Sequence, residues 1–282
     1  MSSSRKMVAK RGSYVLSTGE AAAKRLKLLH SAYGPAGRNV LIQSGIKAGM
    51  RVADLGCGVG MTTQLLSELV GPSGEVVGVD FNLAQIEEAR RSLPKKIRTV
   101  SFLNASATET GLPRESFDLV YSRFLLIHLS QPELALREMS ELLKPNGILV
   151  CEDGDLTTAW SEPSSELGLF SDLFGRLGPK WGVDYTLGRR LFQMVRAAGF
   201  GDVNITFNQP AIARGEQKRL LELSVAEAAP AFIDANLISK TDLDRALKAM
   251  VSLAEDENVL AVLPRMSQVW ARKSPNNLKR PK

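Results

Sequence analysis

The stretch RVADLGCGVG, residues 51–60, constrains the fold more than any other part of this chain. It begins as an apolar run, carries an acid at Asp54, and then places glycine at positions 56, 58 and 60, directly before the helical pattern MTTQLLSELV. Glycine between a strand and a helix permits a tight turn and lets a ligand come close to the main chain and the helix N-terminus. The stretch therefore predicts the first strand and a ligand-binding loop of an α/β fold.

The sequence that follows alternates β-branched runs with helical patterns, which is typical of a parallel sheet covered by helices on both faces. We expect strands at 51–55, 75–80, 98–105, 117–122 and 147–153, and helices at 61–70, 82–93 and 131–143, with Asn82 as an N-cap. Outside this region we expect an amphipathic helix over 19–33, an aromatic-rich loop over 155–185, a helix over 187–198, a strand at 203–207, two helical stretches between about 212 and 256, and a last strand at 267–273.

Composition excludes several classes of protein. No run approaches eighteen apolar residues and the N-terminus lacks an apolar signal segment, so we expect a cytoplasmic protein. The two cysteines, Cys57 and Cys151, are too few for a disulfide framework or a thiolate metal site, and we predict metal-independent chemistry. The net charge of +6 comes from the ends: residues 1–19 and 271–282 hold nine basic side chains and no acid, and the rest of the chain is slightly acidic. This pattern favours solvated tails over a nucleic-acid-binding surface.

The glycine spacing argues against a dinucleotide site. The G-x-G-x-x-G fingerprint needs its third glycine at position 61, which is Met61 here. Asp54, two residues before the first glycine, would be costly at a strand end unless it received hydrogen bonds or faced a cationic ligand. Both departures favour a ligand that carries a positive charge over a nicotinamide.

These residues resemble a known family. VADLGCGVG, followed by VVGVD ending at Asp80, resembles the first motif and acidic strand end of class I S-adenosylmethionine-dependent methyltransferases. FLNASATETGLPRESFDLVYSRF and LLKPNGILVCED agree with that family in order and spacing, so the resemblance covers about residues 38–153. The outer segments are similar to bacterial small-molecule methyltransferases, which implies an acceptor from secondary metabolism.

The resemblance implies a Rossmann-like, doubly wound, mostly parallel seven-stranded sheet with an N-terminal helical lid and a helical insertion before the last strand. On this basis we expect a tail and lid over 1–37, the methyltransferase core over 38–209, a helical cap over 210–265, and the last strand with a basic tail over 266–282. The lid and the aromatic segment would also allow a homodimer.

The resemblance further implies a binding site for S-adenosylmethionine, which leaves as S-adenosylhomocysteine. Asp54 would hold the ammonium group, Asp80 the ribose hydroxyls, and Phe81 the adenine ring by stacking. Ser106 stands where many relatives have an aspartate for the adenine amino group, and a serine accepts that hydrogen bond more weakly. The remaining cofactor residues implied are the loop residues Gly56, Cys57, Gly58 and Gly60, the backbone amide of Ala107, and Tyr14 as a lid.

Acceptor residues are predicted from the rule that open α/β sheets bind ligands beyond the carboxyl ends of their strands. Three candidates for catalysis follow the fourth strand: Tyr121, Arg123 and His128. His128 could act as a base, or could equally pack or cap a helix; Arg123 could bind a substrate carboxylate, or only a backbone carbonyl. His30 is expected to be a partly exposed helix residue. The candidates for the acceptor pocket are Asp153 and five aromatic residues, Trp160, Phe170, Phe174, Trp181 and Tyr185. The aromatic residues could instead form a hydrophobic cluster or a dimer contact.

Other functions remain in competition. A nucleic-acid or protein methyltransferase would keep the cofactor site and change the acceptor site. However, YSRF lacks the D/N/S-P-P-Y/F/W signature of amino-methylating DNA enzymes, and neither cysteine follows a proline as in cytosine C5 enzymes. Arsenite methylation generally needs more thiols than two. A noncatalytic cofactor-binding partner protein would keep the same cofactor motifs. The sequence therefore predicts methyl transfer to a small molecule, possibly aromatic or indole-like, without choosing between carbon, nitrogen and oxygen as the target.

Overall fold

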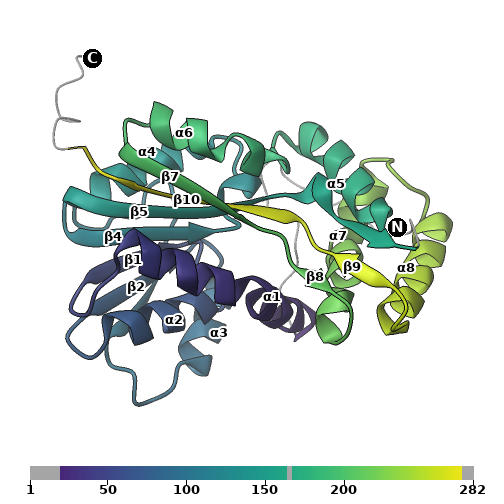
Figure 1. Ribbon diagram of the computed structural model, residues 1–282, viewed down its shortest axis with the longest axis horizontal. Helices are drawn as coiled ribbons and strands as arrows, with labels where there is room; N and C mark the ends of the chain where they lie inside the picture. Colours follow the sequence, from purple (N-terminus) through teal and green to yellow (C-terminus); the bar gives the residue numbers. More distant parts are fainter. Residues whose placement is uncertain (1–19, 164–166, 275–282) are drawn as a thin grey trace, which may run out of the picture.

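A seven-stranded sheet forms the centre of the protein in the computed structural model, which describes residues 20–163 and 167–274 (Figure 1). The strand order is β3-β2-β1-β4-β5-β10-β7. Pairing is parallel from β3 to β5, whereas β10 runs antiparallel to both of its neighbours. The strands are β1 Arg51–Leu55, β2 Glu75–Asp80, β3 Val100–Asn104, β4 Phe117–Arg123, β5 Leu143–Asp155, β7 Gly201–Asn208 and β10 Arg265–Arg272. The predicted mostly parallel seven-stranded sheet is confirmed.

Helices cover both faces of this sheet. The helices α1 Glu20–Ser44, α2 Met61–Val70 and α3 Leu83–Ser92 lie on one face, and α4 Pro132–Leu142 and α6 Leu191–Ala197 on the other (Figure 1). Apolar spacing decides which side of each helix is buried: in α2, Leu66 and Val70 pack against Val52 and Val76 of the central strands. Because helices cover both faces, β1 and β2 are buried along almost their whole length, as parallel strands usually are.

A second group of elements lies beyond one end of the sheet and forms the cap (Figure 1). It contains α5 Gly168–Trp181, α7 Leu220–Asp234, α8 Lys240–Glu255 and a small sheet in the order β6-β9-β8. The small strands are β6 Trp160–Glu162, β8 Ala211–Ile212 and β9 Leu260–Val262. Four short 3-10 turns complete the described part of the chain: η1 Leu126–His128, η2 Leu156–Thr158, η3 Leu187–Arg189 and η4 Glu216–Arg219.

One apolar core joins the cap to the sheet. Met139 of α4, Phe174 of α5 and Phe232 of α7 belong to the same buried cluster as Val120 of β4. Phe174 makes edge contacts with both Tyr185 and Phe232, at ring-centroid distances of 5.2 Å. The cap therefore holds a fixed place over the end of the sheet, where the carboxyl ends of β1 and β4 point.

The structure corrects several expectations. α1 runs through Pro35 to Ser44, so the predicted boundary between residues 37 and 38 falls inside a helix. The segment 155–185, expected to be a loop, contains η2, β6 and the 14-residue helix α5. Glycines and Pro179 in α5 obscured its helical pattern, while buried Leu173, Phe174 and Leu177 stabilise it through packing. The helix expected over 187–198 is divided into η3 and α6.

The other boundaries agree with expectation to within a few residues, and Asn82 is the N-cap of α3, accepting hydrogen bonds from the backbone of Ala84 and Gln85. Across the described residues, no helix is both long enough and apolar enough to span a membrane.

Candidate functional site

The loop after β1 is shaped by three glycines in left-handed conformations. The φ angles are 74° at Gly56, 55° at Gly58 and 79° at Gly60, a region that side chains other than glycine adopt at a cost. The backbone amides of Gly56 and Cys57 donate to the carbonyl of Val79 at 2.8 and 3.0 Å, which attaches the loop to the end of β2. The loop is therefore a rigid backbone surface that leads into the N-terminus of α2.

Asp80 ends β2 beside this loop. Its Oδ2 accepts a hydrogen bond from the Gly58 amide at 3.0 Å, and its Oδ1 accepts one from the Asn82 amide at 2.9 Å. Burial raises the pKa of Asp80, and these amides partly oppose the rise. Because Asn82 supplies the N-cap of α3, the carboxylate is not needed to cap that helix. Asp80 is thus placed at the cavity edge with bonds that fix its orientation.

A first cavity opens beside Asp80. Phe81, with 59% of its surface exposed, stands at its rim, and Gln85 of α3 closes one side. Ser106 and Ala107 line it from the loop after β3, where the Ser106 hydroxyl already lies 2.8 Å from Thr108 Oγ1. The structure therefore brings together Gly56, Asp80, Phe81, Ser106 and Ala107, five of the residues predicted to bind the cofactor.

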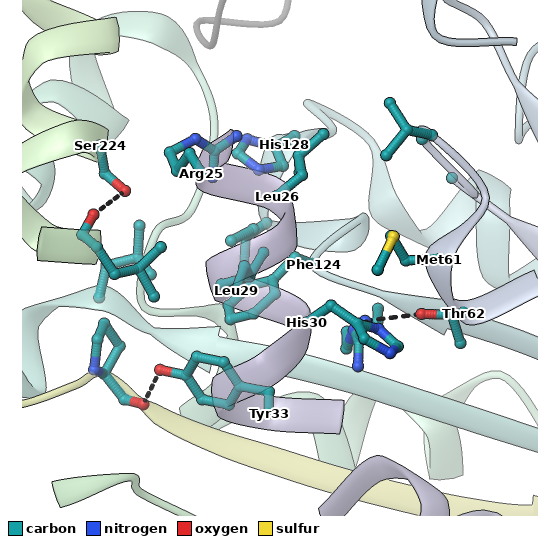
Figure 2. A pocket seen from close by; sticks show the side chains of 18 of the residues that line it. Arg25, Leu26, Leu29, His30, Tyr33, Met61, Thr62, Phe124, His128 and Ser224 are labelled. Atoms are coloured by element: carbon teal, nitrogen blue, oxygen red, sulfur yellow. Dashed lines mark hydrogen bonds between the residues drawn. The ribbon is translucent and has the colours of Figure 1, made fainter. Parts of the chain in front are cut away.

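A second cavity lies on the other side of the loop, between the sheet and the cap. Figure 2 shows Leu29, His30 and Tyr33 projecting into it from α1, with Met61 and Thr62 facing them from the start of α2. The Tyr33 hydroxyl donates to the carbonyl of Pro264 at 2.7 Å, which holds α1 against the connection between β9 and β10. Apolar side chains form most of the remaining wall: Leu26, Phe124, Ile127, Leu156, Phe170, Phe174, Leu220 and Leu221.

The two cavities meet at the loop. Gly56, Phe124 and His128 line both of them. A ligand that filled the first cavity and crossed the loop would therefore present its end to the apolar second cavity, beside His128.

Asp54 lies at the bottom of the second cavity and is only 2% exposed. Its Oδ2 accepts a hydrogen bond from the Thr63 hydroxyl at 2.6 Å. Burial raises the pKa of Asp54 to about 6, although the Thr63 hydroxyl and the charge of Arg123 oppose the rise. A buried carboxylate of this kind is a favourable partner for a ligand cation.

Arg123, at the end of β4, lines the same cavity as Asp54, and its positive charge acts on the Asp54 carboxyl. Its Nη2 donates to Thr62 Oγ1 at 2.7 Å and to His30 Nδ1 at 3.0 Å. Since a guanidinium can only donate, His30 Nδ1 must be an acceptor, and the imidazole is neutral. Burial, with a smaller contribution from Arg123, lowers the pKa of His30 to about 4, in agreement with this assignment.

His128 is held in η1 at the junction of the two cavities. Its ring packs edge-on against Tyr185 at a centroid distance of 5.8 Å. Burial lowers the pKa of His128 to about 3, and the nearby charge of Arg25 contributes to the decrease. His128 is therefore an uncharged imidazole at neutral pH. Arg25 itself is paired with Glu227 of α7, Nε to Oε2 at 2.5 Å, and both side chains are almost completely buried.

Several predicted site residues lie away from both cavities. Tyr121 is fully buried within the core beneath α1 and α2, where its hydroxyl donates to Glu152. Asp153 is also fully buried, and its Oδ2 accepts a hydrogen bond from the Leu126 amide at 2.9 Å, which holds the start of η1. Burial raises the pKa of Asp153 to about 8. Neither side chain lines either cavity, and Asp153 acts only by holding η1, which carries Ile127 and His128.

Some of the predicted aromatic residues line the second cavity and others lie away from it. Phe170 and Phe174 line the second cavity, whereas Tyr185 lies behind them against His128. Trp160 pairs with Val262 in the small sheet and is 46% exposed, and Trp181 ends α5 away from both cavities. Two of the six predicted acceptor residues therefore contact the cavity. Tyr14 lies outside the described residues.

Sequence reasoning missed the part of the cavity wall that α1 and α7 provide. His30, interpreted as a partly exposed helix residue, is a cavity residue bonded to Arg123. A usable signal existed in the spacing of Leu26, Leu29, His30 and Tyr33, which places all four on one helix face. No comparable signal connected α7 to the site, because residues 220–224 meet α1 only in the folded chain.

Comparison with known proteins agrees with this geometry. Residues 46–181 match the model of a family described as "Methyltransferase domain". Over 126 residues the chain is 39% identical to the ubiquinone/menaquinone biosynthesis C-methyltransferase UbiE of Pseudomonas paraeruginosa, covering 44% of this chain and 47% of the relative. It is 34% identical over 114 residues to a demethylmenaquinone methyltransferase of Staphylococcus aureus, covering 40% of this chain and 47% of the relative. The chain spans about half the length of the curated relatives it matches.

Solved structures show the same fold. A putative methyltransferase from Bacillus halodurans superposes with a TM-score of 0.54 at 17% identity, covering 89% of this chain and 99% of the other. The phosphoethanolamine N-methyltransferase 2 of Haemonchus contortus, in complex with phosphomonomethylethanolamine and S-adenosylhomocysteine, gives 0.53 at 17% identity, covering 89% of this chain and 52% of the other. Residues 46–181 therefore match a methyltransferase family in sequence and the chain shares the fold of solved methyltransferases, so the predicted resemblance to the class I S-adenosylmethionine-dependent family is confirmed.

Proposed function

We propose that this protein transfers a methyl group from S-adenosylmethionine to a small, largely apolar acceptor bound between the sheet and the cap. The observation that carries the proposal is the meeting of two different cavities at Gly56, Phe124 and His128. One is rimmed by a fixed carboxylate and an exposed aromatic ring, and the other is walled by apolar side chains. This arrangement suits a transfer reaction, in which donor and acceptor must meet end to end.

The residues present fit S-adenosylmethionine. Asp80 can accept hydrogen bonds from two ribose hydroxyls, Phe81 can cover an adenine ring, and the loop from Gly56 to Gly60 leaves its backbone open to the ligand. Asp54 offers a buried negative charge to the ammonium group. When bound, the cofactor supplies a methyl group already activated on a sulfonium. The protein's contribution is then mainly to align the acceptor and to exclude water.

His128 is placed to handle the acceptor's proton. Its neutral imidazole can accept a hydrogen bond from an acceptor hydroxyl or amine, and can take the proton as that atom is methylated. Burial and the charge of Arg25 keep the basicity of His128 low, so it suits an acceptor whose proton is already acidic. An acceptor that ionises on its own would therefore need little help from the base.

The apolar wall favours an aromatic or other ring-shaped acceptor. Phe124, Phe170 and Phe174 border the cavity, and α1, α5 and α7 close over it. A closed cavity favours a small molecule over a nucleic acid or a protein. The curated relatives are named for C-methylation in ubiquinone and menaquinone biosynthesis, so a quinone-type ring is the second candidate within this class. An indole-like acceptor, a role in secondary metabolism, a cytoplasmic location, a homodimer and metal independence stay predictions.

Calorimetric titration with S-adenosylhomocysteine, S-adenosylmethionine and NAD tests the proposal. We expect micromolar binding of the two adenosyl ligands and none of NAD. Incubation with S-adenosylmethionine carrying a labelled methyl group, followed by mass spectrometry on phenol, indole and quinol candidates, then identifies the acceptor. Label transferred to RNA, DNA or protein in preference to every small molecule would refute the choice of acceptor. A protein that binds but transfers nothing to any of these would be a cofactor-binding partner protein.

A further inference from the structure

Arg25 carries hydrogen-bond donors that the protein itself leaves unused. Its Nε donates to Glu227 Oε2 at 2.5 Å, and within the described residues no hydrogen bond is made by Nη1 or Nη2. Only 4% of Arg25 is exposed, yet neither Nη is among the fully enclosed polar atoms that lack a partner. The accessible surface of these two nitrogens therefore belongs to the second cavity, which Arg25 lines. A guanidinium N–H in an apolar cavity is costly unless a ligand atom accepts from it.

Glu227 of α7 holds the guanidinium by one edge only. In the described part of the chain its Oε1 is buried and has no hydrogen-bond partner, so the pair is joined through Nε and Oε2 and not by two parallel bonds. Burial raises the pKa of Glu227, and the charge and hydrogen bond of Arg25 oppose the rise. The carboxylate therefore cancels the charge of Arg25 and fixes its orientation without occupying its Nη groups.

Arg25 and His128 lie together at one end of the second cavity. Figure 2 shows them beside each other, with Ser224 of α7 at the same end and His30 further along α1. The neutral imidazole of His128 can accept a hydrogen bond, whereas Arg25 can only donate. The Ser224 hydroxyl is already engaged, since it donates to the Leu220 carbonyl at 2.7 Å. A ligand hydroxyl fits this end, because its oxygen can accept from Arg25 while its hydrogen is donated to His128.

Amines and carboxylates fit the same end less well. An aromatic amine can donate to His128, but its nitrogen is a poor acceptor because its lone pair is shared with the ring. A carboxylate accepts well but brings a negative charge close to that of Glu227, and like charges repel strongly where water is excluded. The remaining wall, which includes Phe170, Phe174 and Leu221, is apolar and suits the ring that carries the hydroxyl.

We propose that Arg25 is a specificity-determining residue that binds the hydroxyl group of a phenolic or enolic acceptor, and that Glu227 is a positioning residue that orients the guanidinium and repels carboxylates. The inference rests on the proposed function, because that proposal assigns the second cavity to the acceptor. It narrows the acceptor from an apolar ring to a ring that carries a neutral hydroxyl. Arg25 lies on α1 and Glu227 on α7, so recognition depends on the contact between these two helices.

Three probes that differ in one group test the role of Arg25: 4-methylphenol, 4-methylaniline and 4-methylbenzoate. Each is titrated into protein saturated with S-adenosylhomocysteine and followed by ligand-observed NMR. We expect wild-type protein to bind the phenol about 10- to 100-fold more tightly than the aniline, and the benzoate most weakly. Arg25→Met should lower the affinity for the phenol to that for the aniline and leave the aniline unchanged. Arg38→Met, at an exposed position on α1, is the matched control and should change none of the three affinities.

Glu227 needs a readout that a purely structural role would not move. Glu227→Gln keeps an oxygen that can accept from Arg25 Nε but removes the negative charge. It should change the affinity for 4-methylphenol less than about three-fold and strengthen 4-methylbenzoate about ten-fold or more, whereas simple loosening of the cavity would weaken every probe. The double variant Arg25→Met with Glu227→Gln leaves no unpaired buried charge, so it keeps the test valid if Arg25→Met alone folds poorly. Thermal melting checks the folding of each variant.

Every outcome decides between the two roles. If Arg25→Met and the double variant still prefer 4-methylphenol to 4-methylaniline, Arg25 does not select the acceptor. If Glu227→Gln rejects 4-methylbenzoate as strongly as wild type does, Glu227 is not the source of that rejection. Wild-type protein that bound none of the three probes, while binding S-adenosylhomocysteine, would overturn the inference and leave the proposed function standing. If wild-type protein binds neither adenosyl ligand, the proposed function itself fails.

Discussion

The two cavities are built in different ways. The first cavity, proposed for the cofactor, is made from consecutive pieces of chain: the loop from Gly56 to Gly60, the end of β2 at Asp80, and the loop after β3. The second cavity, proposed for the acceptor, gathers α1 with α5 and α7, which lie more than a hundred residues further along the chain. The first is stabilised by backbone geometry and the fixed carboxylate of Asp80, and the second mainly by side-chain packing. Substitutions in the first cavity should therefore weaken cofactor binding whatever the acceptor, whereas those in the second should alter which acceptor is used.

The largest effect is expected where backbone conformation and packing act together. Gly60 has a φ of 79°, and a Cβ there would come within 2.8 Å of the Phe102 ring. Gly60→Ala should lower the free energy of unfolding by about 2–4 kcal/mol, from backbone strain and from overpacking. Gly182→Ala is the matched control, because Gly182 is also left-handed, with φ 69° and ψ 30°, but has nothing within 4 Å of an added Cβ, and it should cost about 1 kcal/mol. Urea denaturation measures both, and equal losses would show that packing against Phe102 is unimportant.

The next largest effect is expected from replacing Asp80, the carboxylate proposed to bind the ribose hydroxyls. Asp80→Asn should weaken S-adenosylhomocysteine about 10- to 100-fold, since a charged acceptor of two hydrogen bonds is replaced by a neutral one. Asp172→Asn, at an exposed position on α5, is the control for a change of charge alone. Calorimetry gives both affinities, and an Asp80→Asn protein that binds as well as wild type would remove Asp80 from the site.

Asp54 links binding to stability. Because its pKa is raised to about 6, the folded state binds more protons than the unfolded state between about pH 4 and 6, and the contribution of Asp54 to stability falls as the pH rises through this range. Above pH 6 the ionised carboxylate is a constant cost. Asp54→Asn should therefore be more stable than wild type at pH 7.5 by about 1–2 kcal/mol, and should bind the cofactor less tightly.

The comparison must be made as a difference between variant and wild type. His30 and His128, whose pKa values are lowered, bind fewer protons when folded, so their contributions to stability rise with pH and oppose that of Asp54. Urea denaturation at pH 4.5 and 7.5 separates the effects: the gain from Asp54→Asn should be present at pH 7.5 and nearly absent at pH 4.5. A gain that did not depend on pH would mean that the pKa of Asp54 is the same in the folded and the unfolded protein, so that burial does not raise it.

The smallest effect is expected from the acceptor wall. Leu29 is half-buried on α1 and lines the second cavity only. Leu29→Ala should raise the KM for the acceptor by about 3- to 10-fold, through lost apolar contact, and change S-adenosylhomocysteine affinity less than two-fold. Steady-state kinetics and calorimetry together provide the test. If cofactor affinity fell as much as acceptor affinity, the two cavities would not be separable.

The same contrast explains what the sequence could predict. Asp54, Asp80 and the glycines stand at fixed spacings along neighbouring strands, so a local pattern and the family resemblance it carries were enough to predict a shared site and a mostly parallel seven-stranded sheet. Asn82 was identified for the same reason, since capping depends on adjacent residues.

The acceptor side depends on contacts that no local pattern contains. Tyr121 and Arg123 both lie in β4 and face the same side, but Tyr121 is inside the sheet and packs in the core, whereas Arg123 ends the strand at the cavity. Trp160 and Trp181 are close in sequence to Phe170, yet the small sheet and the end of α5 carry them away from the site. His30 was undervalued because its partner, Arg123, lies 93 residues further along the chain.

The course of the chain between β7 and β10 has a consequence for how such a protein can change. These strands are neighbours, and Asn208 at the end of β7 is paired with Met266 near the start of β10. The segment between them, which includes α7 and α8, therefore leaves and rejoins the sheet at adjacent points. It can be exchanged for a segment of different length or sequence without moving a strand of the large sheet, so this part of the wall of the second cavity is open to replacement by recombination or by grafting, while the half that carries the first cavity is retained.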